Sequence, residues 1–259
     1  MFHRTVGFVG GGRIARILLT GWNRVALTRS RIVVADPDES ATQRLTSLVD
    51  RLEVAPGDNR EAASQDIVFL AIHPPAFGPV LNEIKTDLKP GAVVVSLAPK
   101  HSFARLAEML GGFDRLARTI PNAPSLVGSG FNPIAFASTL SADDRVVLAD
   151  LLRPLGESPE VAEAKLEAYA ILTAMGPTYF WPQLYELQEL AEEFGLSHEE
   201  AADGLRAMVV GALVTMHESG LSPKDVQDLI PVKPLSESEE MIRHAYRTKL
   251  TALMEKIRP

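Results

Sequence analysis

The sequence predicts an α/β protein in which a doubly wound parallel sheet is followed by an all-helical region. Three observations support this fold class. Short apolar, β-branched runs alternate with helical stretches in the first part of the chain, and a glycine-rich turn follows the first run. From about residue 161 onward the pattern indicates helices alone. Strands that alternate with helices form parallel βαβ units, whose sheet is covered on both faces.

The expected strands are apolar runs with the length and composition of buried strands. In chain order they are expected at Thr5–Val9, Arg31–Asp36, Asp66–Ile72, Ala92–Ala98, Arg115–Ile120 and Asn132–Ser138. The helical stretches between the first strands are expected at residues 13–22, Glu39–Leu48, Asn59–Ser64 and Phe77–Leu88. These elements predict a dinucleotide-binding domain over residues 1–158.

The next helical stretches lie on either side of the expected domain boundary near residue 158. A helix at Ser141–Leu152 begins with a serine cap and an acidic residue three positions on. Another runs from Ala162 toward Gly195. We expect an interruption near Gly176-Pro177 and a kink or break at Pro182, because proline removes a backbone hydrogen bond.

Three further helices are expected within residues 159–259. One begins at Ser197, where Glu200 completes a capping box, and a short one has Ser222 as its cap. The last covers about Ser238–Ile257 and carries one apolar stripe, formed by Met241, Ile242, Ala245, Leu250, Leu253, Met254 and Ile257. We therefore expect a helical dimerisation and substrate domain in a homodimer or dimer-based oligomer; alternatively, the apolar stripes only cover each other.

Composition excludes several classes of function. The 259 residues carry a net charge of −7 without a long basic run, so nucleic acid is not an expected partner. The absence of cysteine excludes disulfides, thiolate catalysis and cysteine-ligated metals. The first strand begins too early to leave room for a signal peptide, and the longest apolar run, near residues 207–216, is too short to span a membrane. A cytoplasmic protein is expected.

The turn after the first strand reads Gly10-Gly11-Gly12-Arg13-Ile14-Ala15 and fits the pattern G-x-G-x-x-A. Such a turn lets pyrophosphate approach the backbone, and the following helix offers free N–H groups to it. Because the turn lies between a strand and a helix at the start of a βαβ series, it predicts a Rossmann-type site. A glycine-rich turn that binds nothing is the alternative.

Asp36 ends the second expected strand, a little over twenty residues past the glycines. A carboxylate at this place accepts hydrogen bonds from the adenosine ribose and repels a 2′-phosphate. Arg31 and Arg44 are the nearest basic residues, and neither directly follows Asp36. NAD is therefore favoured over NADP. The alternative is a turn or capping aspartate, since "ADPDES" also has turn chemistry.

The segments "FVGGGRIA", "DIVFLAIHP" and "RTIPNAPSLVGSG" resemble those of the pyrroline-5-carboxylate reductase family, and the resemblance runs nearly end to end. It implies reduction of a cyclic imine to proline with NAD(P)H, and so a role in proline biosynthesis. The resemblance also implies positions beside the cofactor. They are Asn59 in "DNREA", Ala71, His73 and Pro74 in "AIHPP", Ala98 in "SLAPKHS" and Asn122 in "RTIPN". His73 stands where the family has lysine.

The second half of the chain continues the resemblance and then departs from it. Tyr179 lies in "TAMGPTYFW", which resembles the Gly-Pro-Ala-Tyr segment that opens the family's long helix. The family's substrate loop, Ser-Pro-Gly-Gly-Thr-Thr, holds the substrate carboxylate with hydroxyls and backbone N–H groups. Here residues 232–237 read Val-Lys-Pro-Leu-Ser-Glu, so both glycines are lost and Ser236 alone keeps a hydroxyl.

Two lysines are candidates for the lost interactions. Lys233 supplies a point charge within the altered loop. Lys100 replaces a glycine of the family beside the cofactor and is a candidate general acid, if desolvation lowers its pKa. We therefore take Lys100 and Ser236 as catalytic candidates, and Tyr179, Lys233 and Ser236 as substrate-binding candidates. The alternative is that both lysines are ordinary solvated side chains.

For the remaining histidine and aromatic residues the sequence favours structural roles. His198, His217 and His244 lie on expected helices without a partner at metal-ligand spacing, so no metal site is predicted. Trp181 and Tyr185 are typical of a core or a dimer interface. The function expected is hydride transfer from NAD(P)H to a small cyclic imine. The alternatives are a reductase of the same fold for a hydroxy or keto acid, and a non-catalytic nucleotide-binding paralogue.

Overall fold

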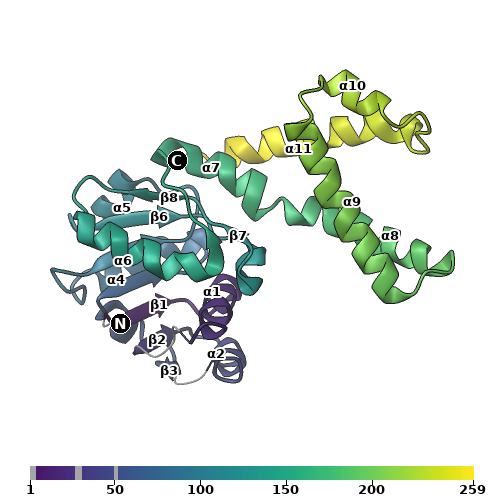
Figure 1. Cartoon of the computed structure of the whole chain (residues 1–259). Coiled ribbons are helices and arrows are strands. Elements are labelled where there is room, and N and C mark those ends of the chain that lie inside the picture. The colour runs from purple at the N-terminus through teal and green to yellow at the C-terminus, as the bar shows by residue number, and fades with distance from the viewer. Residues whose placement is uncertain (1–3, 27–30, 50–51) are drawn as a thin grey trace. The chain divides into compact units, whose positions relative to one another are not determined.

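The computed structural model describes residues 4–26, 31–49 and 52–259, and the chain divides into two compact units (Figure 1). One unit comprises Met1–Met175 together with Met254–Pro259, and the other comprises Gly176–Leu253. The boundary expected near residue 158 stays a prediction.

The first unit is built on a seven-stranded sheet with the order β3-β2-β1-β4-β5-β6-β8. Its strands are β1 (Val6–Val9), β2 (Ile32–Ala35), β3 (Leu52–Val54), β4 (Ile67–Leu70), β5 (Val93–Ser96), β6 (Leu116–Thr119) and β8 (Ile134–Phe136). All neighbours pair in parallel except β6 and β8, which are antiparallel. The sheet is therefore mostly parallel. The α/β fold class is confirmed.

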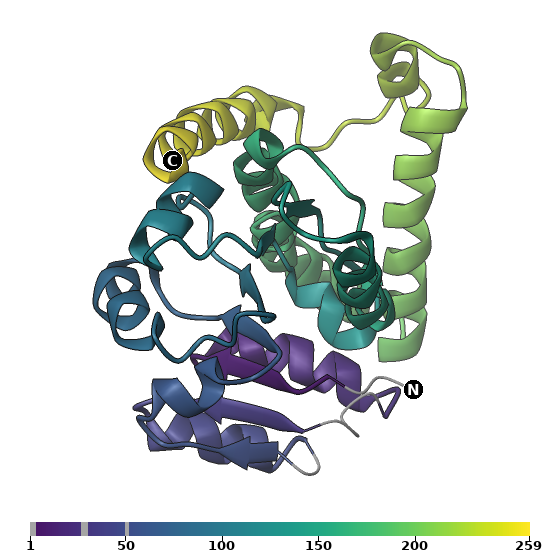
Figure 2. The same ribbon diagram turned by 90° about the vertical axis from the view of Figure 1, so that its left-hand side faces the viewer.

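Helices lie along both faces of this sheet. They are α1 (Arg13–Asn23), α2 (Glu39–Thr46), α3 (Asn59–Ala63), α4 (Phe77–Ile84), α5 (Phe103–Met109) and α6 (Ala142–Leu152). One buried cluster joins β-strand side chains to α1 and α6, and the other joins them to α3, α4 and α5. In Figure 2 the purple helix α1 runs alongside the purple strand β1. Burial on both faces explains why the strands read as continuous apolar runs.

An aromatic cluster fixes α1 on the first strands. The ring of Phe8 stacks on Phe69 at 4.9 Å, and the Trp22 ring meets both of them edge-on at 5.7 Å. The indole N–H of Trp22 donates to the carbonyl of Leu151, 2.6 Å away. Trp22 therefore buries a large apolar surface without leaving its one donor unpaired.

The end of the first unit carries shorter elements. A second, two-stranded sheet pairs β7 (Gly130–Phe131) with β9 (Gly156–Glu157) in parallel. The chain then forms a 3₁₀ turn η5 (Glu163–Lys165), the one-turn helix α7 (Leu166–Tyr169) and a π-helical turn η6 (Ala170–Ala174). This stretch packs through Leu166 and Ala170 on Ile120 and Ala135, so it lies against the end of β6.

The second unit contains α8 (Pro177–Glu193), α9 (His198–Glu218), α10 (Pro223–Asp228), the 3₁₀ turn η7 (Ser236–Ser238) and most of α11 (Glu239–Ile257). The capping box of α9 is confirmed: Glu200 N–H donates to Ser197 Oγ at 3.2 Å, and Ser197 N–H to Glu200 Oε2 at 2.8 Å. Of the kink or break predicted at Pro182, a break is wrong, because α8 continues through this residue, and a kink stays a prediction. A 17-residue helix tolerates the loss of one backbone hydrogen bond.

Among the described residues, no helix is long and apolar enough to cross a membrane. The second unit nevertheless exposes many large apolar side chains on α8, α9, the connections that follow and the start of α11. They include Phe180, Trp181, Tyr185, Phe194, Met208, Val210, Leu213, Val214, Ile230, Val232 and Met241. Trp181 and Tyr185 therefore do not belong to a core of the single chain.

Candidate functional site

A groove of about 640 Å³ lies at the carboxyl ends of β2, β1 and β4. Val9 pairs with both Ala35 and Leu70, so the three strands end at the same level. The strand order reverses direction between β1 and β4, which is the topological switch point where doubly wound sheets bind ligands. The lining residues are Gly10, Gly11, Gly12, Arg13, Arg16, Asp36, Pro37, Asp38, Ala41, Arg44, Leu45, Ala71, Ile72, His73 and Ala76.

The glycines of the turn have different physical roles. Gly10 has φ +101°, and a Cβ there would lie 2.6 Å from the carbonyl oxygen of Ala71. Gly10 is thus required by the fold itself. A Cβ on Gly12 would meet no atom of the described residues within 4 Å, although Gly12 lines the groove. Its missing side chain leaves room for a ligand to approach the backbone.

The first turn of α1 is suited to an anion. Gly12 is its N-cap and makes no side-chain cap bond, and the first turn contains no acidic residue. Its N–H groups and helix dipole therefore face the groove without a negatively charged side chain on α1 to compete. Arg13 and Arg16 add positive charge along the same wall. These features fit the pyrophosphate of a dinucleotide.

Asp36 lines the groove next to the glycine turn and binds the backbone on both sides. Its Oδ2 accepts the N–H of Gly11 at 2.7 Å, and its Oδ1 accepts the N–H of Asp38 at 2.8 Å. The cap of α2 is Asp38, whose pKa is lowered by hydrogen bonds from Ser40. Asp36 thus shapes the turn, while each of its oxygens retains lone pairs for a further donor.

Arg44 stands beside the two aspartates, with Nη2 3.9 Å from Asp38 Oδ2. Sequence reasoning considered Arg44 only as a nearby base and missed Arg16, Pro37, Asp38, Ala41, Leu45, Ile72 and Ala76 as groove residues. Helical spacing carries the signal for Arg16, because residues 13 and 16 share one face of α1.

Of the predicted cofactor residues, seven line the groove: Gly10, Gly11, Gly12, Arg13, Asp36, Ala71 and His73. His73 occupies the N-cap position of the 3₁₀ turn η2 (Pro74–Ala76) but makes no side-chain cap bond there, and the residue is exposed. Pro74 is the first residue of that turn. Ile14, Pro74, Asn59, Ala98 and Asn122 are not groove-lining residues.

Asn59 and Asn122 make hydrogen bonds within the protein. Asn59 begins α3, and its Nδ2 donates to Glu83 Oε2 at 3.0 Å. Asn122 is buried after β6; its Nδ2 donates to the carbonyl of Thr173 at 3.1 Å, and its Oδ1 accepts the N–H of Phe131 at 3.1 Å. Both side chains therefore fix local structure, and their cofactor roles stay predictions.

Lys100 lies in the loop between β5 and α5, at the same edge of the sheet. The loop begins level with β4, because Ser96 pairs with Leu70. Lys100 has φ +85° and its side chain is exposed in the single chain. The structure thus does not show the desolvation on which the general-acid hypothesis depends, and that role stays a prediction.

A charge cluster, formed by the buried Arg118 and Glu167 and the partly exposed Glu163, holds the loop that carries Lys100. The guanidinium of Arg118 is fully buried and binds Glu163 Oε1 at 2.9 Å and Glu167 Oε1 at 2.5 Å. The same two oxygens accept the N–H of Phe103 at 2.6 Å and the N–H of Lys100 at 3.3 Å. Sequence reasoning missed this cluster, because Arg118 lies 45 and 49 residues before the two glutamates.

His101 connects this loop to the neighbouring helix. Its imidazole stacks on Phe77, the first residue of α4, with ring centres 4.5 Å apart. Burial lowers the pKa of His101, and the positive charges of Lys100, Arg118 and Arg105 lower it further. The imidazole is therefore neutral at pH 7.

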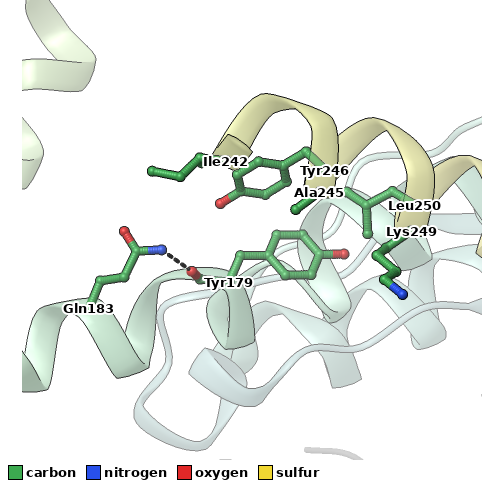
Figure 3. Close-up of a pocket in the computed structure, with 7 residues that line it drawn as sticks. All are labelled: Tyr179, Gln183, Ile242, Ala245, Tyr246, Lys249 and Leu250. Carbon is green, nitrogen blue, oxygen red and sulfur yellow. Dashed lines mark hydrogen bonds between the residues drawn. The ribbon is translucent and has the colours of Figure 1, made fainter. Parts of the chain in front are cut away.

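The substrate candidates of the second unit are only partly brought together. Tyr179 lines a pocket of about 360 Å³ between α8 and α11, where its ring meets Tyr246 edge-on at 5.8 Å (Figure 3). Burial raises the pKa of Tyr179, and Tyr246 raises it further. Lys233 and Ser236 do not line this pocket; they lie exposed between α10 and α11. Ser236 begins the turn η7.

Over the described parts of the chain, no cluster of three or more histidine, aspartate or glutamate side chains is arranged to hold a metal ion.

Comparison with known proteins gives consistent matches. Residues 5–100 match the family model described as "NADP oxidoreductase coenzyme F420-dependent". The chain is 30% identical over 227 residues to the pyrroline-5-carboxylate reductase of Corynebacterium melassecola, covering 86% of this chain and 83% of the relative. It is 24% identical over 233 residues to that of Escherichia coli K12, covering 88% and 85%.

Solved structures are similar over nearly the whole chain. A pyrroline carboxylate reductase of Plasmodium falciparum with NADP bound matches with a TM-score of 0.73 and 21% identity, covering 99% of this chain and 95% of that one. A pyrroline-5-carboxylate reductase of Coxiella burnetii matches with a TM-score of 0.69 and 26% identity, at the same coverage.

Proposed function

The chain belongs to the pyrroline-5-carboxylate reductase family of NAD(P)-dependent reductases, and from that premise we propose that it reduces a small cyclic imine of the pyrroline-5-carboxylate class. The observation that carries this proposal is the groove at the switch point of the sheet, where a glycine turn and an uncapped helix N-terminus meet. The family resemblance supports the substrate class, and the groove supports the cofactor class.

The groove residues have distinct tasks in holding the cofactor. Backbone N–H groups of the glycine turn and of the start of α1 bind the pyrophosphate. Asp36 accepts the ribose hydroxyls with lone pairs that its turn hydrogen bonds leave available, and its charge disfavours a 2′-phosphate. We therefore propose that NADH is preferred over NADPH. When bound, the cofactor supplies the hydride.

We propose that residues after the strands on the other side of the glycine turn contact the nicotinamide half. Ala71 and His73 follow β4 in the groove, and Ala98 follows β5 in the next loop. Asn122 follows β6, where its hydrogen bonds hold the loop in one conformation. Their role is to orient the nicotinamide ring and exclude water from the hydride path.

The second unit supplies the proposed substrate contacts and the proposed dimer interface. Tyr179 is the substrate contact from α8, and Lys233 and Ser236 are the polar groups of the altered loop. Exposed aromatic and aliphatic side chains on α8 and α9 favour a homodimer formed through these helices, since a monomer rarely leaves so many uncovered.

The test is steady-state oxidation of NADH and NADPH with pyrroline-5-carboxylate, set against a panel of keto acids and other imines. Turnover that is selective for pyrroline-5-carboxylate is expected. Selective turnover of a keto acid would instead assign a dehydrogenase of the same fold. Tight cofactor binding in calorimetry with no turnover on any substrate would identify a non-catalytic paralogue.

A further inference from the structure

The backbone of Lys100 lies in a region that residues with a Cβ rarely adopt. Its φ is +85°, and in the described part of the chain Ala26 is the other non-glycine residue with positive φ. A lysine in this conformation costs free energy that a glycine would not, and such residues persist where their surroundings over-determine them. Residues of this kind gather at functional sites, so Lys100 calls for an explanation.

The surroundings of Lys100 hold the loop in two ways. The cluster of Arg118, Glu163 and Glu167 binds the N–H groups at positions 100 and 103. In addition, the imidazole of His101 in the same loop stacks on Phe77. This cluster resists displacement, because the guanidinium of Arg118 is fully buried and moving Glu167 away would leave it only the partly exposed Glu163 as a charge partner. The loop is thereby fixed while the lysine side chain remains exposed.

The loop lies toward the end of the groove opposite Asp36. The sheet order β2-β1-β4-β5 places Asp36 after the first of these strands and Lys100 after the last. Phe77, which stacks on His101, directly follows the groove residue Ala76. A dinucleotide with its ribose on Asp36 and its phosphates on the glycine turn therefore extends toward the loop of Lys100.

The exposed ammonium of Lys100 is the charge that this loop offers to a ligand. Arg118 shares its single positive charge between the buried Glu167 and the partly exposed Glu163, so these three side chains sum to −1, and the two carboxylates bind the backbone of the loop. Within the described residues, no carboxylate pairs with the ammonium of Lys100, whereas Arg105 pairs with Glu108. An unpaired ammonium on a fixed backbone is a preorganised point charge for a carboxylate.

We propose that Lys100 binds the carboxylate of the substrate, and that Glu167 and Arg118 are positioning residues that hold its backbone in the strained conformation. This inference rests on the proposed function and identifies Lys100 as the group that selects an imine with a carboxylate. It does not require Lys100 to donate a proton, because only the charge of the side chain is used.

The test compares kcat/KM for pyrroline-5-carboxylate with kcat/KM for 1-pyrroline, the same ring without the carboxylate. Lys100→Asn removes the charge and tolerates positive φ, whereas Lys100→Arg keeps the charge. The ratio of kcat/KM for pyrroline-5-carboxylate to kcat/KM for 1-pyrroline is expected to fall at least about tenfold in Lys100→Asn, because one charge-assisted hydrogen bond is lost. In Lys100→Arg this ratio is expected to stay within about threefold of the wild-type value. Lys85→Asn, at another exposed lysine, is the matched control. An unchanged ratio in Lys100→Asn overturns the proposal.

Glu167→Gln tests the positioning role. This variant is expected to lower the same ratio in the wild-type background and to leave it unaltered in the Lys100→Asn background, because Glu167 acts through Lys100. A purely structural role would lower stability, and so the melting temperature, in both backgrounds without this dependence. Equal effects on the ratio in the two backgrounds contradict the positioning role.

Binding measurements separate this inference from the proposed function. If the wild-type protein reduces neither imine, the proposed function fails, and calorimetry of L-proline against pyrrolidine in the presence of NADH then decides the inference. Loss of at least about tenfold in L-proline affinity in Lys100→Asn supports it. Equal affinity in wild type and variant, or no L-proline binding to the wild type, overturns it.

Discussion

At the scale of single residues, Asp36 accepts hydrogen bonds from the backbone of the turn, and we propose that it also binds the ribose of the cofactor. A substitution of Asp36 tests the second role. Asp36→Ser keeps a short polar side chain but removes the charge that disfavours a 2′-phosphate. The ratio of kcat/KM for NADH to that for NADPH is expected to fall roughly 10- to 100-fold. Asp38→Ser, at a groove residue whose capping role serine also fills, is the control. An unaltered ratio in Asp36→Ser would refute the proposed NADH preference.

The glycines of the turn provide a matched pair of variants. Gly12 has φ −71° and space for a Cβ, so Gly12→Ala is expected to leave the free energy of unfolding nearly unchanged while raising KM for NADH at least about tenfold. Gly10→Ala meets the carbonyl of Ala71 at positive φ and is expected to lower the free energy of unfolding by about 2 kcal/mol or more. Thermal unfolding and cofactor titration check both. Normal NADH affinity in Gly12→Ala would contradict the phosphate-binding role.

Residue-level reasoning from the sequence succeeds where a local motif has one physical purpose. Gly10, Gly12 and Asp36 fall in the groove, because their spacing follows from the strand–turn–helix geometry of the site. The hydrogen bonds of Asn122 to Thr173 and Phe131 were not predictable, since they depend on how distant segments return to β6. The left-handed backbone of Lys100 likewise comes from contacts outside its own segment.

At the scale of elements, long periodic segments and capped helices were predictable and short ones were not. Ser141 and Ser197 cap α6 and α9 as their sequence patterns indicate. The edge strand β3 escaped prediction because it has three residues and its burial is only partial. The seven-residue α5, capped by Ser102, escaped because about two helical turns give a weak apolar period.

The carboxylate of Asp144 links three segments of the first unit, and we expect these contacts to weaken in acid. Its carboxylate binds Arg4 at 2.8 Å, Arg115 at 2.6 Å and the Ser141 hydroxyl at 2.6 Å, linking the start of α6 to the chain before β1 and before β6. Burial alone would raise the pKa of Asp144, but the hydrogen bonds and the two arginines outweigh it and hold the pKa below 3.8.

Asp144→Asn is expected to lower the free energy of unfolding by about 3 kcal/mol at pH 7. Because the folded pKa lies below the unfolded value, the stabilisation by the carboxylate is present above about pH 3.8 and is lost as the pH falls through the folded pKa. The stability difference between wild type and variant should therefore shrink on acidification below about pH 4. Denaturant unfolding over this pH range measures it, and a difference independent of pH would show that the charge contributes nothing.

At the scale of the whole molecule, the sequence identified the family and the order of a sheet unit before a helical unit. The domain boundary that it predicts near residue 158, where the last strand pattern ends, stays a prediction, and the first compact unit extends to Met175. The stretch 163–174 is helical, yet it packs on the end of β6 through Leu166 and Ala170 and supplies Glu167 to Arg118. Helical pattern alone does not show which unit a helix joins.

The exposed apolar surface of α8 and α9 leads to the last prediction, that the protein is a homodimer in solution. Leu213 on α9 is 51% exposed and Leu48 in the first unit is 45% exposed, so the two residues form a matched pair. Leu213→Asp places a charge in the proposed interface and is expected to shift the mass measured by light scattering from twice 28.1 kDa toward 28.1 kDa. Leu48→Asp is expected to leave the dimer intact.

Because the groove lies in the first unit, the Leu213→Asp variant should retain NADH binding although its dimer dissociates. A wild-type protein that is monomeric at micromolar concentration, or a dimer that tolerates Leu213→Asp, would show that these helices do not form the interface.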